Sequence, residues 1–355
     1  HRDLHSFPTR RSSDLPSIEV KLVRFADKDS HLLFLEPEGL GSDEFYLNGF
    51  STALPEEVQE RAVRTIEGLE HVWITRPGYA IEYDYFEPTH LRATLESRVL
   101  PNVWFAGQVN GTSGYEEAAG QGILAGANAA LRAQGKQAVF TLSRSQAYIG
   151  VMIDDLITRG AGEPYRLFTA RAEHRLLLRN DNCYERLMGL GRDLGLVSES
   201  DFRMMESRWE QKREILAALA SKTVDGASLL QVLRRPGSDP REVLAAHPDL
   251  AGLSISDDVL EAVEVEARYA GYIQREAGEA EKQRKAESLA IGEDIDYFAI
   301  QEISFESREK LSAVRPTSIG QASRIPGVSP ADISVLLVRR KAGTLPRLAG
   351  EGAME

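Results

Sequence analysis

The sequence predicts an α/β part followed by an all-α part. Two observations indicate the first part: short β-rich runs bounded by Gly, Pro and Asp, and one strand, glycine-rich turn and helix in succession. After Gly135 the strand signals fade, and long amphipathic segments rich in Glu, Arg, Leu and Ala indicate helices. We therefore predict a domain boundary near Gly135 to Leu142.

The composition describes a chain that folds. With 355 residues, 42% of them hydrophobic, it is long enough to bury the cores of two or three domains. The net charge of -12 argues against uniform attraction to nucleic acid or to an anionic membrane, so any RNA contact requires a local basic patch. Cys183 cannot form an internal disulfide, and no run approaches the roughly 20 apolar residues that span a bilayer. We expect a soluble cytoplasmic protein without membrane contact.

The first predicted elements follow a leader. Residues 1 to 15 show no apolar periodicity, and Ser6 to Leu15 resembles a translated sequencing adapter, so we expect a non-native leader there. Beyond it, one helix is predicted from about Pro55 to Glu67, where hydroxyl caps precede a proline. Three short runs predict strands: Lys21 to Phe25, His31 to Leu35, and Val72 to Thr75.

A glycine-rich loop then lies between a predicted strand, Leu100 to Gly107, and a predicted helix, Tyr115 to Arg132. Such a loop lets backbone N–H groups approach a ligand at the positive end of the helix. Small residues along the helix, Ala118, Gly122, Ala125 and Gly126, permit close packing on a sheet or a flat cofactor. The glycine spacing is not the G-x-G-x-x-G fingerprint, so a simple tight turn remains an alternative.

The run Phe105 to Ala119, read as FAGQVNGTSGYEEAA, resembles the signature of one family. That family is the flavin-binding large subunit of the tRNA wobble-uridine 5-carboxymethylaminomethyl modification enzyme, or glucose-inhibited division protein A. The resemblance covers roughly Pro16 to Lys341 and implies the C-terminal part of a Rossmann-like FAD-binding domain plus a helical C-terminal domain. Five further runs resemble family motifs, in order: Pro16 to Glu19, Phe34 to Gly39, Arg76 to Asp84, Glu163 to Arg166, and Ser318 to Ile325.

The resemblance implies three regions after the leader. Residues 16–138 would form a partial FAD- and NAD-binding α/β domain, and residues 139–290 a helical tRNA-contacting domain. Residues 291–355 would form a small helical module for partner docking, with a disordered tail.

The resemblance also implies cofactor contacts. Gln108 would touch the flavin, and the helix beginning at Tyr115 would point at the isoalloxazine, where its dipole stabilises the anionic reduced flavin. Val20 stands where the family usually has Asp. The implied FAD residues are Gly107, Gln108, Asn110, Gly111, Thr112, Gly114, Tyr115 and Glu116, and the implied NADH residues are Pro16, Ser17, Ile18, Glu19, Lys21, Arg24 and Phe25.

No catalytic residue is expected. The family has a cysteine directly before Pro-Ser-Ile-Glu that attacks the uracil ring, and this sequence has Leu15 there, which cannot act as a nucleophile. The family's N-terminal glycine-rich motif for the FAD pyrophosphate is also missing, so we expect the chain as written to be inactive. The histidines lack metal-ligand spacing, and no metal is expected.

A basic segment runs from Pro164 to Arg192, where six arginines oppose three acidic residues and leave a net charge of plus three. Arg171, Arg175 and Arg179 are four residues apart and would form one stripe on a helix, able to contact successive phosphates. The alternative is a solvated helical face with intrahelical ion pairs. The resemblance favours tRNA contact by Arg166, Arg171, Arg175 and Arg179, and the aromatic side chains of Tyr165, Phe168 and His174 could stack on unpaired bases.

The helical part has three further signals. Helices are predicted at Ser200 to Leu219 and Asp257 to Glu287, joined by the Pro- and Gly-bearing stretch Arg234 to Asp249. Residues 323–340 read as two short helices about a glycine turn, with Ser329 as cap and Pro330 at the first helical position. This pattern is similar to a DNA-reading helix-turn-helix, but Ile333 and the apolar run after Ser334 need burial. The resemblance implies docking of a partner GTPase instead, with a hydrophobic core as the alternative.

The resemblance implies one activity for the intact parent: FAD- and NADH-dependent modification of C5 of the wobble uridine, U34, to the carboxymethylaminomethyl or aminomethyl state. It further implies a folate one-carbon donor delivered through the GTPase partner, and a homodimer. Two other classes remain open from the residues alone. One is a small-molecule flavin oxidoreductase, and the other is a non-enzymatic nucleic-acid-binding helical module.

Overall fold

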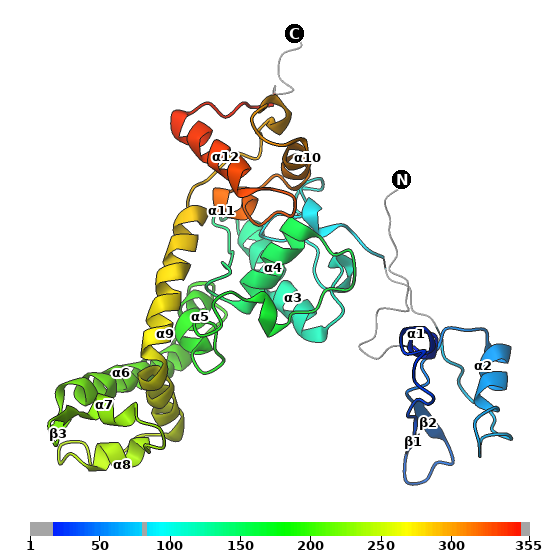
Figure 1. Cartoon of the computed structure of the whole chain (residues 1–355), viewed down its shortest axis with the longest axis horizontal. Helices are drawn as coiled ribbons and strands as arrows, with labels where there is room; N and C mark the ends of the chain where they lie inside the picture. The colour runs from blue at the N-terminus through cyan, green and yellow to red at the C-terminus, as the bar shows by residue number, and fades with distance from the viewer. Residues whose placement is uncertain (1–16, 80–83, 349–355) are drawn as a thin grey trace. The chain divides into compact units, whose positions relative to one another are not determined.

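The computed structural model describes residues 17–79 and 84–348. The chain divides into two compact units, one of His1–Ala129 with Gly160–Arg166 and one of Ala130–Arg159 with Leu167–Glu355. The first unit mixes helices with a strand pair and the second is almost entirely helical (Figure 1), so the predicted order of an α/β part and an all-α part is confirmed. Within the described ranges, no helix is both long and apolar enough to cross a membrane.

The first unit begins with α1 (Ile18–Arg24). The strand predicted at Lys21 to Phe25 is therefore wrong. Ile18, Leu22 and Phe25 recur at helical spacing, and α1 has Glu19 in its first turn and Arg24 in its last, which suits the helix dipole. These signals outweigh the β propensity of the run.

An antiparallel hairpin follows, made of β1 (Phe34–Pro37) and β2 (Phe45–Asn48), with Leu35 opposite Leu47. The strand predicted at His31 to Leu35 thus begins three residues later than expected. The predicted helix is present as α2 (Glu56–Val63), but it ends four residues before the predicted Glu67. Pro55 is at its N-cap position, and no side chain makes the predicted capping hydrogen bond there. Val72 to Thr75 forms no strand, because no described segment pairs with it and Trp73 is 81% exposed.

The helix after the glycine-rich loop is confirmed as α3 (Tyr115–Ala133). The preceding run, Leu100 to Gly107, is not a strand in the described structure. A strand needs a paired neighbour, and only Trp104 in this run forms a bridge, to Glu96. Two short 3-10 turns complete this part of the chain: η2 (Pro88–His90) and η3 (Gln108–Asn110).

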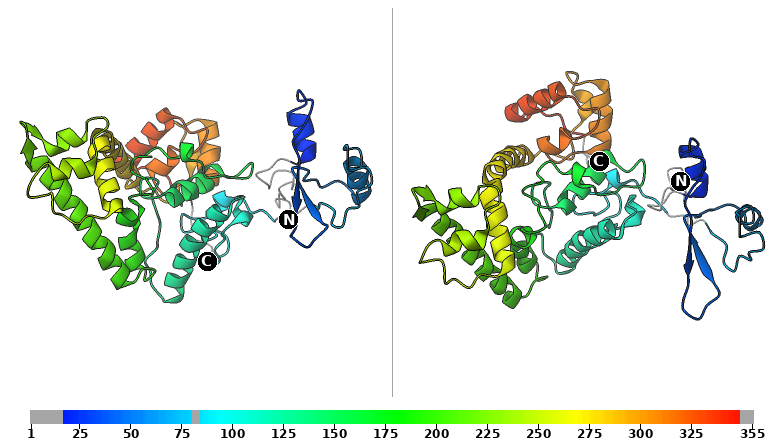
Figure 2. Two further views of the ribbon diagram at one scale, coloured as in Figure 1. Left: turned by 90° about the horizontal axis from the view of Figure 1, so that it is seen from below. Right: turned by 60° about the horizontal axis from the view of Figure 1, so that its bottom comes forward.

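The second unit contains α4 (Tyr148–Arg159), then η4 (Thr169–Arg171) and α5 (Cys183–Asp193). The two predicted long helices are confirmed as α6 (Glu199–Ser221) and α9 (Asp257–Glu287). Between them lie a two-stranded ribbon, β3 (Thr223–Val224) with β4 (Ala227–Ser228), and the helices α7 (Leu229–Leu233) and α8 (Pro240–Ala245). Figure 2 shows α6, α7 and α8 gathered against the first half of α9, where Leu219, Leu233 and Val263 are fully buried.

The chain ends in η5 (Tyr297–Ala299), α10 (Phe305–Val314), α11 (Ile319–Ala322) and α12 (Pro330–Ala342), which we call the C-terminal module. The helix predicted after the glycine turn is confirmed as α12, with Gly327 at φ +93°. The helix before the turn, α11, ends at Ala322 and so lies before the predicted run of residues 323–340. Ser329 caps α12 in a capping box with Asp332. The module has its own core, centred on Leu311, Ile300 and Leu336.

Candidate functional site

Two glycines shape the loop before α3. Gly107 has φ +88° and Gly111 has φ +84°, a left-handed backbone that residues with a side chain adopt only with strain. Gly114 is restricted differently, because a Cβ there would lie 1.7 Å from Oε2 of Glu117. Gly107 and Gly111 are therefore required for this loop conformation, which brings the backbone around to the first turn of α3, whereas a side chain at Gly114 would displace the carboxylate of Glu117.

Gln121 organises the loop from within. It is fully buried on α3, and its Oε1 accepts hydrogen bonds from the Gly107 amide at 3.1 Å and from Nδ2 of Asn110 at 2.8 Å. Its Nε2 donates to Oγ1 of Thr112 at 2.9 Å. Gln121 was not among the residues predicted from the sequence, although a glutamine on the small-residue face of a helix is a signal of a buried polar network.

The residue before Arg166 is hydrogen-bonded to the same loop. The Tyr165 amide donates to the carbonyl of Gly111 at 2.8 Å, and Thr112 and Tyr165 form a parallel bridge. Nε of Arg166 lies 3.3 Å from Oε1 of Glu117, whose side chain is only 4% exposed. Arg166, expected to contact RNA, thus lies beside the glycine-rich loop.

The residues predicted to contact FAD fall into two groups. Asn110 and Thr112 are buried and hold the loop together from behind. Tyr115 is 94% exposed at the start of α3, Glu116 is exposed, and Gln108 is half-buried. Only the second group faces solvent.

The exposed side of α3 can accept a flat ring. Gly122 and Gly126 are exposed, and a Cβ at either would meet no atom within 4 Å. The first-turn amides of a helix lack intrahelical acceptors and carry partial positive charge. Oδ1 of Asn110 is also buried without a hydrogen-bond partner among the described residues. The amides of this first turn, without intrahelical acceptors, fit the polar edge of an isoalloxazine at the N-terminus of α3.

The segment predicted to bind NADH forms one wall of a hollow of about 330 Å³. Ile18 and Leu22 of α1 contribute apolar surface, and Glu19 contributes a carboxylate. Burial acts to raise the pKa of Glu19, but hydrogen bonds from Thr52 and Ser17 outweigh it and lower the pKa below the ordinary value. Lys21 donates to the Gly49 carbonyl at 2.7 Å, and Arg24 and Phe25 are exposed. Pro16 and Leu15 lie outside the described residues.

The predicted arginine stripe is wrong. Arg171, Arg175 and Arg179 do not share a helix, because residues 167–181 form an irregular loop containing only the short η4. Contacts from distant elements hold this loop. Glu276 of α9 accepts hydrogen bonds from the amides of Leu176 at 3.0 Å and Leu177 at 3.3 Å. These side-chain contacts stand in place of the backbone hydrogen bonds that a helix would make at these amides.

The loop presents some predicted RNA-contacting side chains and buries others. Arg175 is exposed without an ion pair among the described residues, Phe168 is 62% exposed, and Arg171 is 34% exposed. Arg179 is held by Asp181 at 2.9 Å and by the Leu176 carbonyl at 2.5 Å.

Base stacking by Tyr165 or His174 does not fit the structure. Tyr165 is 4% exposed and His174 is 5% exposed, with Nε2 of His174 at 2.7 Å from Oε1 of Gln283. A buried ring cannot stack on a base. Phe168 is therefore the exposed aromatic side chain among the three proposed.

The C-terminal module does not resemble a free DNA-reading helix. Leu336 of α12 is fully buried in the module's core, and Ile333, Val335 and Leu337 pack against that core. The hydrophobic-core alternative is thus confirmed for Leu336. Among the residues described, no group of acidic, histidine or cysteine side chains could hold a metal ion.

Three family models match the chain in order. The first is glucose inhibited division protein A, at residues 10–137. The other two describe the tRNA modifying enzyme MnmG/GidA: its C-terminal helical domain at residues 198–277 and its C-terminal helical bundle at residues 279–349.

Curated relatives and solved structures agree with these models. The chain is 48% identical to a tRNA uridine 5-carboxymethylaminomethyl modification enzyme MnmG from Bacillus velezensis, over 94% of this chain and 56% of that protein. A protein of the same name from Geobacillus kaustophilus is also 48% identical, over 95% of this chain and 56% of that protein. The structure of Aquifex aeolicus GidA in the form II crystal matches with a TM-score of 0.77 and 46% identity, covering 91% of this chain and 54% of that chain.

The chain thus spans about half the length of the curated relatives it matches. The three models match consecutive parts of it, and the structural match extends over most of the described residues. The chain belongs to the MnmG/GidA family.

Proposed function

We propose that this chain is the RNA-contacting portion of a flavin-dependent enzyme that modifies C5 of the tRNA wobble uridine to the carboxymethylaminomethyl or aminomethyl state. The observation that carries the proposal is the loop of residues 168–175. This loop presents an exposed phenyl ring at Phe168 and cationic side chains at Arg171 and Arg175. Arginines contact phosphates and aromatic rings stack on unpaired bases, so the loop combines the two contacts that a tRNA anticodon requires.

Arg175 is the principal phosphate contact in this proposal, because it is exposed without an ion pair among the described residues. Arg171 is the second contact, although its Nη1 lies 3.9 Å from Oδ2 of Asp155. Arg166 and Arg179 each lie against a carboxylate, Glu117 and Asp181 respectively, which offsets their charge. A paired arginine attracts phosphate less strongly than an unpaired one, so these two contribute less to binding.

FAD is the proposed redox cofactor, and it would supply two-electron chemistry at its isoalloxazine ring. Gln108 and the first turn of α3 would hold the pyrimidine edge of that ring, with Tyr115 and Glu116 beside it. Gly107, Gly111 and Gly114 would let the backbone approach, while Asn110 and Thr112 keep the loop in shape. The hollow beside Ile18 and Glu19 would receive the nicotinamide of NADH.

The remaining parts of the proposal concern partners. A GTPase that delivers a folate-derived one-carbon unit would dock on the C-terminal module, where Phe298 and Phe305 are 46% and 62% exposed. The intact enzyme would be a homodimer and would act in the cytoplasm, where its tRNA substrate is found.

The test is salt-dependent binding of an unmodified tRNA transcript to the chain. Replacing Arg171 and Arg175 by Ala should weaken binding by roughly tenfold or more and lower the slope of log affinity against log salt by about one per lost phosphate contact. Arg203→Ala is the matched control, because Arg203 is exposed on α6 and, within residues 17–79 and 84–348, pairs only with Glu199. Equal affinities for the double variant and the control would contradict the proposal.

The same measurement separates the alternatives. Preference for duplex DNA over tRNA would support a nucleic-acid-binding module. Flavin binding without any tRNA binding would support a small-molecule flavin oxidoreductase.

A further inference from the structure

One buried arginine connects three segments of the second unit. Arg144 precedes α4, and its side chain is 3% exposed. Its Nη1 donates to Oδ1 of Asp155 at 2.7 Å and to the Val151 carbonyl at 3.1 Å, both on α4. Burial acts to lower the pKa of Arg144, but Glu173, Asp155 and Asp154 outweigh it and raise the pKa. The guanidinium therefore stays charged inside the protein.

Arg144 also binds the loop of residues 168–175, which we call the RNA-contacting loop, on both sides of Ala172. Its Nη2 donates to the Arg171 carbonyl at 3.0 Å, and its Nε donates to Oε1 of Glu173 at 3.0 Å. Ala172 itself is buried against Val151. Arg144 thus fixes the backbone of the loop that carries Arg171 and Arg175, while its own side chain is shielded from any phosphate.

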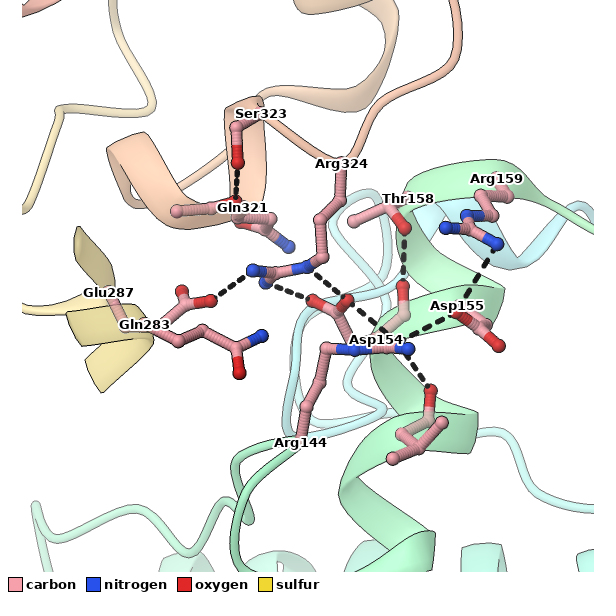
Figure 3. A network of polar contacts seen from close by, with 12 residues as sticks. Arg144, Asp154, Asp155, Thr158, Arg159, Gln283, Glu287, Gln321, Ser323 and Arg324 are labelled. Carbon is pink, nitrogen blue, oxygen red and sulfur yellow. Dashed lines mark hydrogen bonds and ion pairs between the residues drawn. The ribbon is translucent and has the colours of Figure 1, made fainter. Parts of the chain in front are cut away.

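The network continues to the C-terminal module through one carboxylate (Figure 3). Asp154 accepts from Nη1 of Arg144 at 3.2 Å. It also accepts two hydrogen bonds from Arg324, from Nε at 2.6 Å and from Nη2 at 2.7 Å. Arg324 lies between α11 and α12 and also pairs with Glu287 at the end of α9, which accepts from the Ser318 hydroxyl at 2.7 Å. One continuous set of charged contacts therefore runs from the module to the loop.

The balance of charge makes this network stable only as a whole. Arg144 and Arg324 meet four carboxylates: Asp154, Asp155, Glu173 and Glu287. Asp155 also lies 3.9 Å from Nη1 of Arg159 and 3.9 Å from Nη1 of Arg171, which add two further positive charges. Removing one partner of a buried ion pair leaves the other charge desolvated and uncompensated. A change at Arg324 therefore alters the environment of Asp154 and, through it, of Arg144.

We propose that Arg144 is a positioning residue for the RNA-contacting loop, and that Asp154 ties the order of this loop to the C-terminal module through Arg324. The role in RNA binding rests on the proposed function, whereas the order of the loop is a property of the chain alone. Binding of a partner to the C-terminal module would then change the order of the loop, because Arg324 of the module and Arg144 beside the loop both bind the carboxylate of Asp154.

The loop's order is tested by hydrogen–deuterium exchange of peptides covering residues 167–178. In Arg144→Lys the charge remains but the forked contacts to Arg171 and Glu173 are lost, and exchange should accelerate by about tenfold. In Arg324→Lys, acceleration of about threefold is expected, since Asp154 keeps its contact with Arg144. Peptides from α6 and from the first half of α9, residues 257–272, should exchange as in the wild type, because they lie outside these contacts. Arg208→Lys, at an exposed ion pair with Asp258, is the matched control.

Unchanged loop exchange in Arg144→Lys would overturn the positioning role, and unchanged exchange in Arg324→Lys would overturn the link to the module. Should Arg144→Lys fail to fold, Glu173→Gln provides the same test from the loop side, because Glu173 is 43% exposed.

Binding of the tRNA transcript separates positioning from contact. Arg144→Lys should weaken affinity several-fold while keeping the wild-type salt slope, because the same phosphates are bound at the added cost of ordering the loop. A fall in slope like that of Arg175→Ala would overturn positioning in favour of direct contact. If the wild-type chain fails to bind tRNA, the proposed function fails, and the exchange result still decides whether Arg144 orders the loop.

Discussion

Arg166 and Arg175 are the same residue type in different surroundings. Arg166 lies beside the buried carboxylate of Glu117, and its position helps close the glycine-rich loop. Arg175 is exposed, and no ion pair restrains it among the described residues. Surroundings rather than residue type therefore separate an arginine that maintains the fold from one that can bind a phosphate.

Substitution should distinguish these two roles by stability. Arg166→Ala leaves the Glu117 carboxylate buried without this partner and should lower the free energy of unfolding by about 1–3 kcal/mol. Arg175→Ala removes no such contact and should change it by less than about 0.5 kcal/mol. Urea denaturation measures both values. Similar losses in the two variants would contradict the assignment.

Asp332 gives the C-terminal module a dependence on pH. Burial acts to raise its pKa, but hydrogen bonds from Ser329, Ser304 and Ser307 outweigh it and hold the pKa well below the usual range. Because the folded-state pKa lies below the unfolded value, ionised Asp332 stabilises the module above about pH 4, and this contribution is lost as the pH falls further.

Asp332→Asn should therefore destabilise the chain by about 1–3 kcal/mol at pH 7 and flatten the loss of stability below pH 4. Thermal unfolding between pH 7 and pH 2.5 measures both effects. The wild type and the variant should converge as the pH falls, and a constant difference across the range would refute the role of the charge.

At the scale of elements, two helical glycines have opposite surroundings. Gly150 of α4 lies against the preceding chain, where a Cβ would come 2.2 Å from the Ser143 carbonyl oxygen and 2.6 Å from that of Leu142. Gly126 of α3 has open space. The first glycine permits close packing, whereas the second only lowers helix propensity in the chain as it stands.

Gly150→Ala should cost about 1–3 kcal/mol of stability because backbone atoms must move apart. Gly126→Ala should stabilise the chain by up to about 1 kcal/mol through helix propensity. Chemical denaturation of the two matched variants gives the comparison. Stabilisation by Gly150→Ala would show that α4 does not lie this close to residues 142–143.

Elements with strong local signals could be predicted from the sequence. The bounds of α9 and the cap of α12 at Ser329 follow from apolar periodicity and capping residues, which act within a few positions. The irregular conformation of the RNA-contacting loop could not be predicted, because Arg144 and Glu276 hold it from distant parts of the chain. The exposure of Phe168 and the burial of His174 depend on the same tertiary contacts. The residues of the glycine-rich loop could be identified from the motif, but Gln121, whose side chain makes hydrogen bonds to three of them, could not.

At the scale of the whole molecule, charge is distributed unevenly. The chain carries a net charge of -12, yet one short loop of the second unit presents Arg171 and Arg175. This net charge argues against uniform attraction to RNA, so the proposed affinity for tRNA requires a local group of cations.

The most direct test of the account is to map where tRNA touches the chain. Ultraviolet crosslinking of an unmodified tRNA transcript, followed by mass spectrometry of the crosslinked peptides, reports that contact residue by residue. We expect crosslinks in the peptides spanning residues 167–179, centred on Phe168 and Arg175, and their loss in the Arg171→Ala, Arg175→Ala double variant. Crosslinks confined to the β1–β2 hairpin or to α12, and unaffected by the double variant, would contradict it.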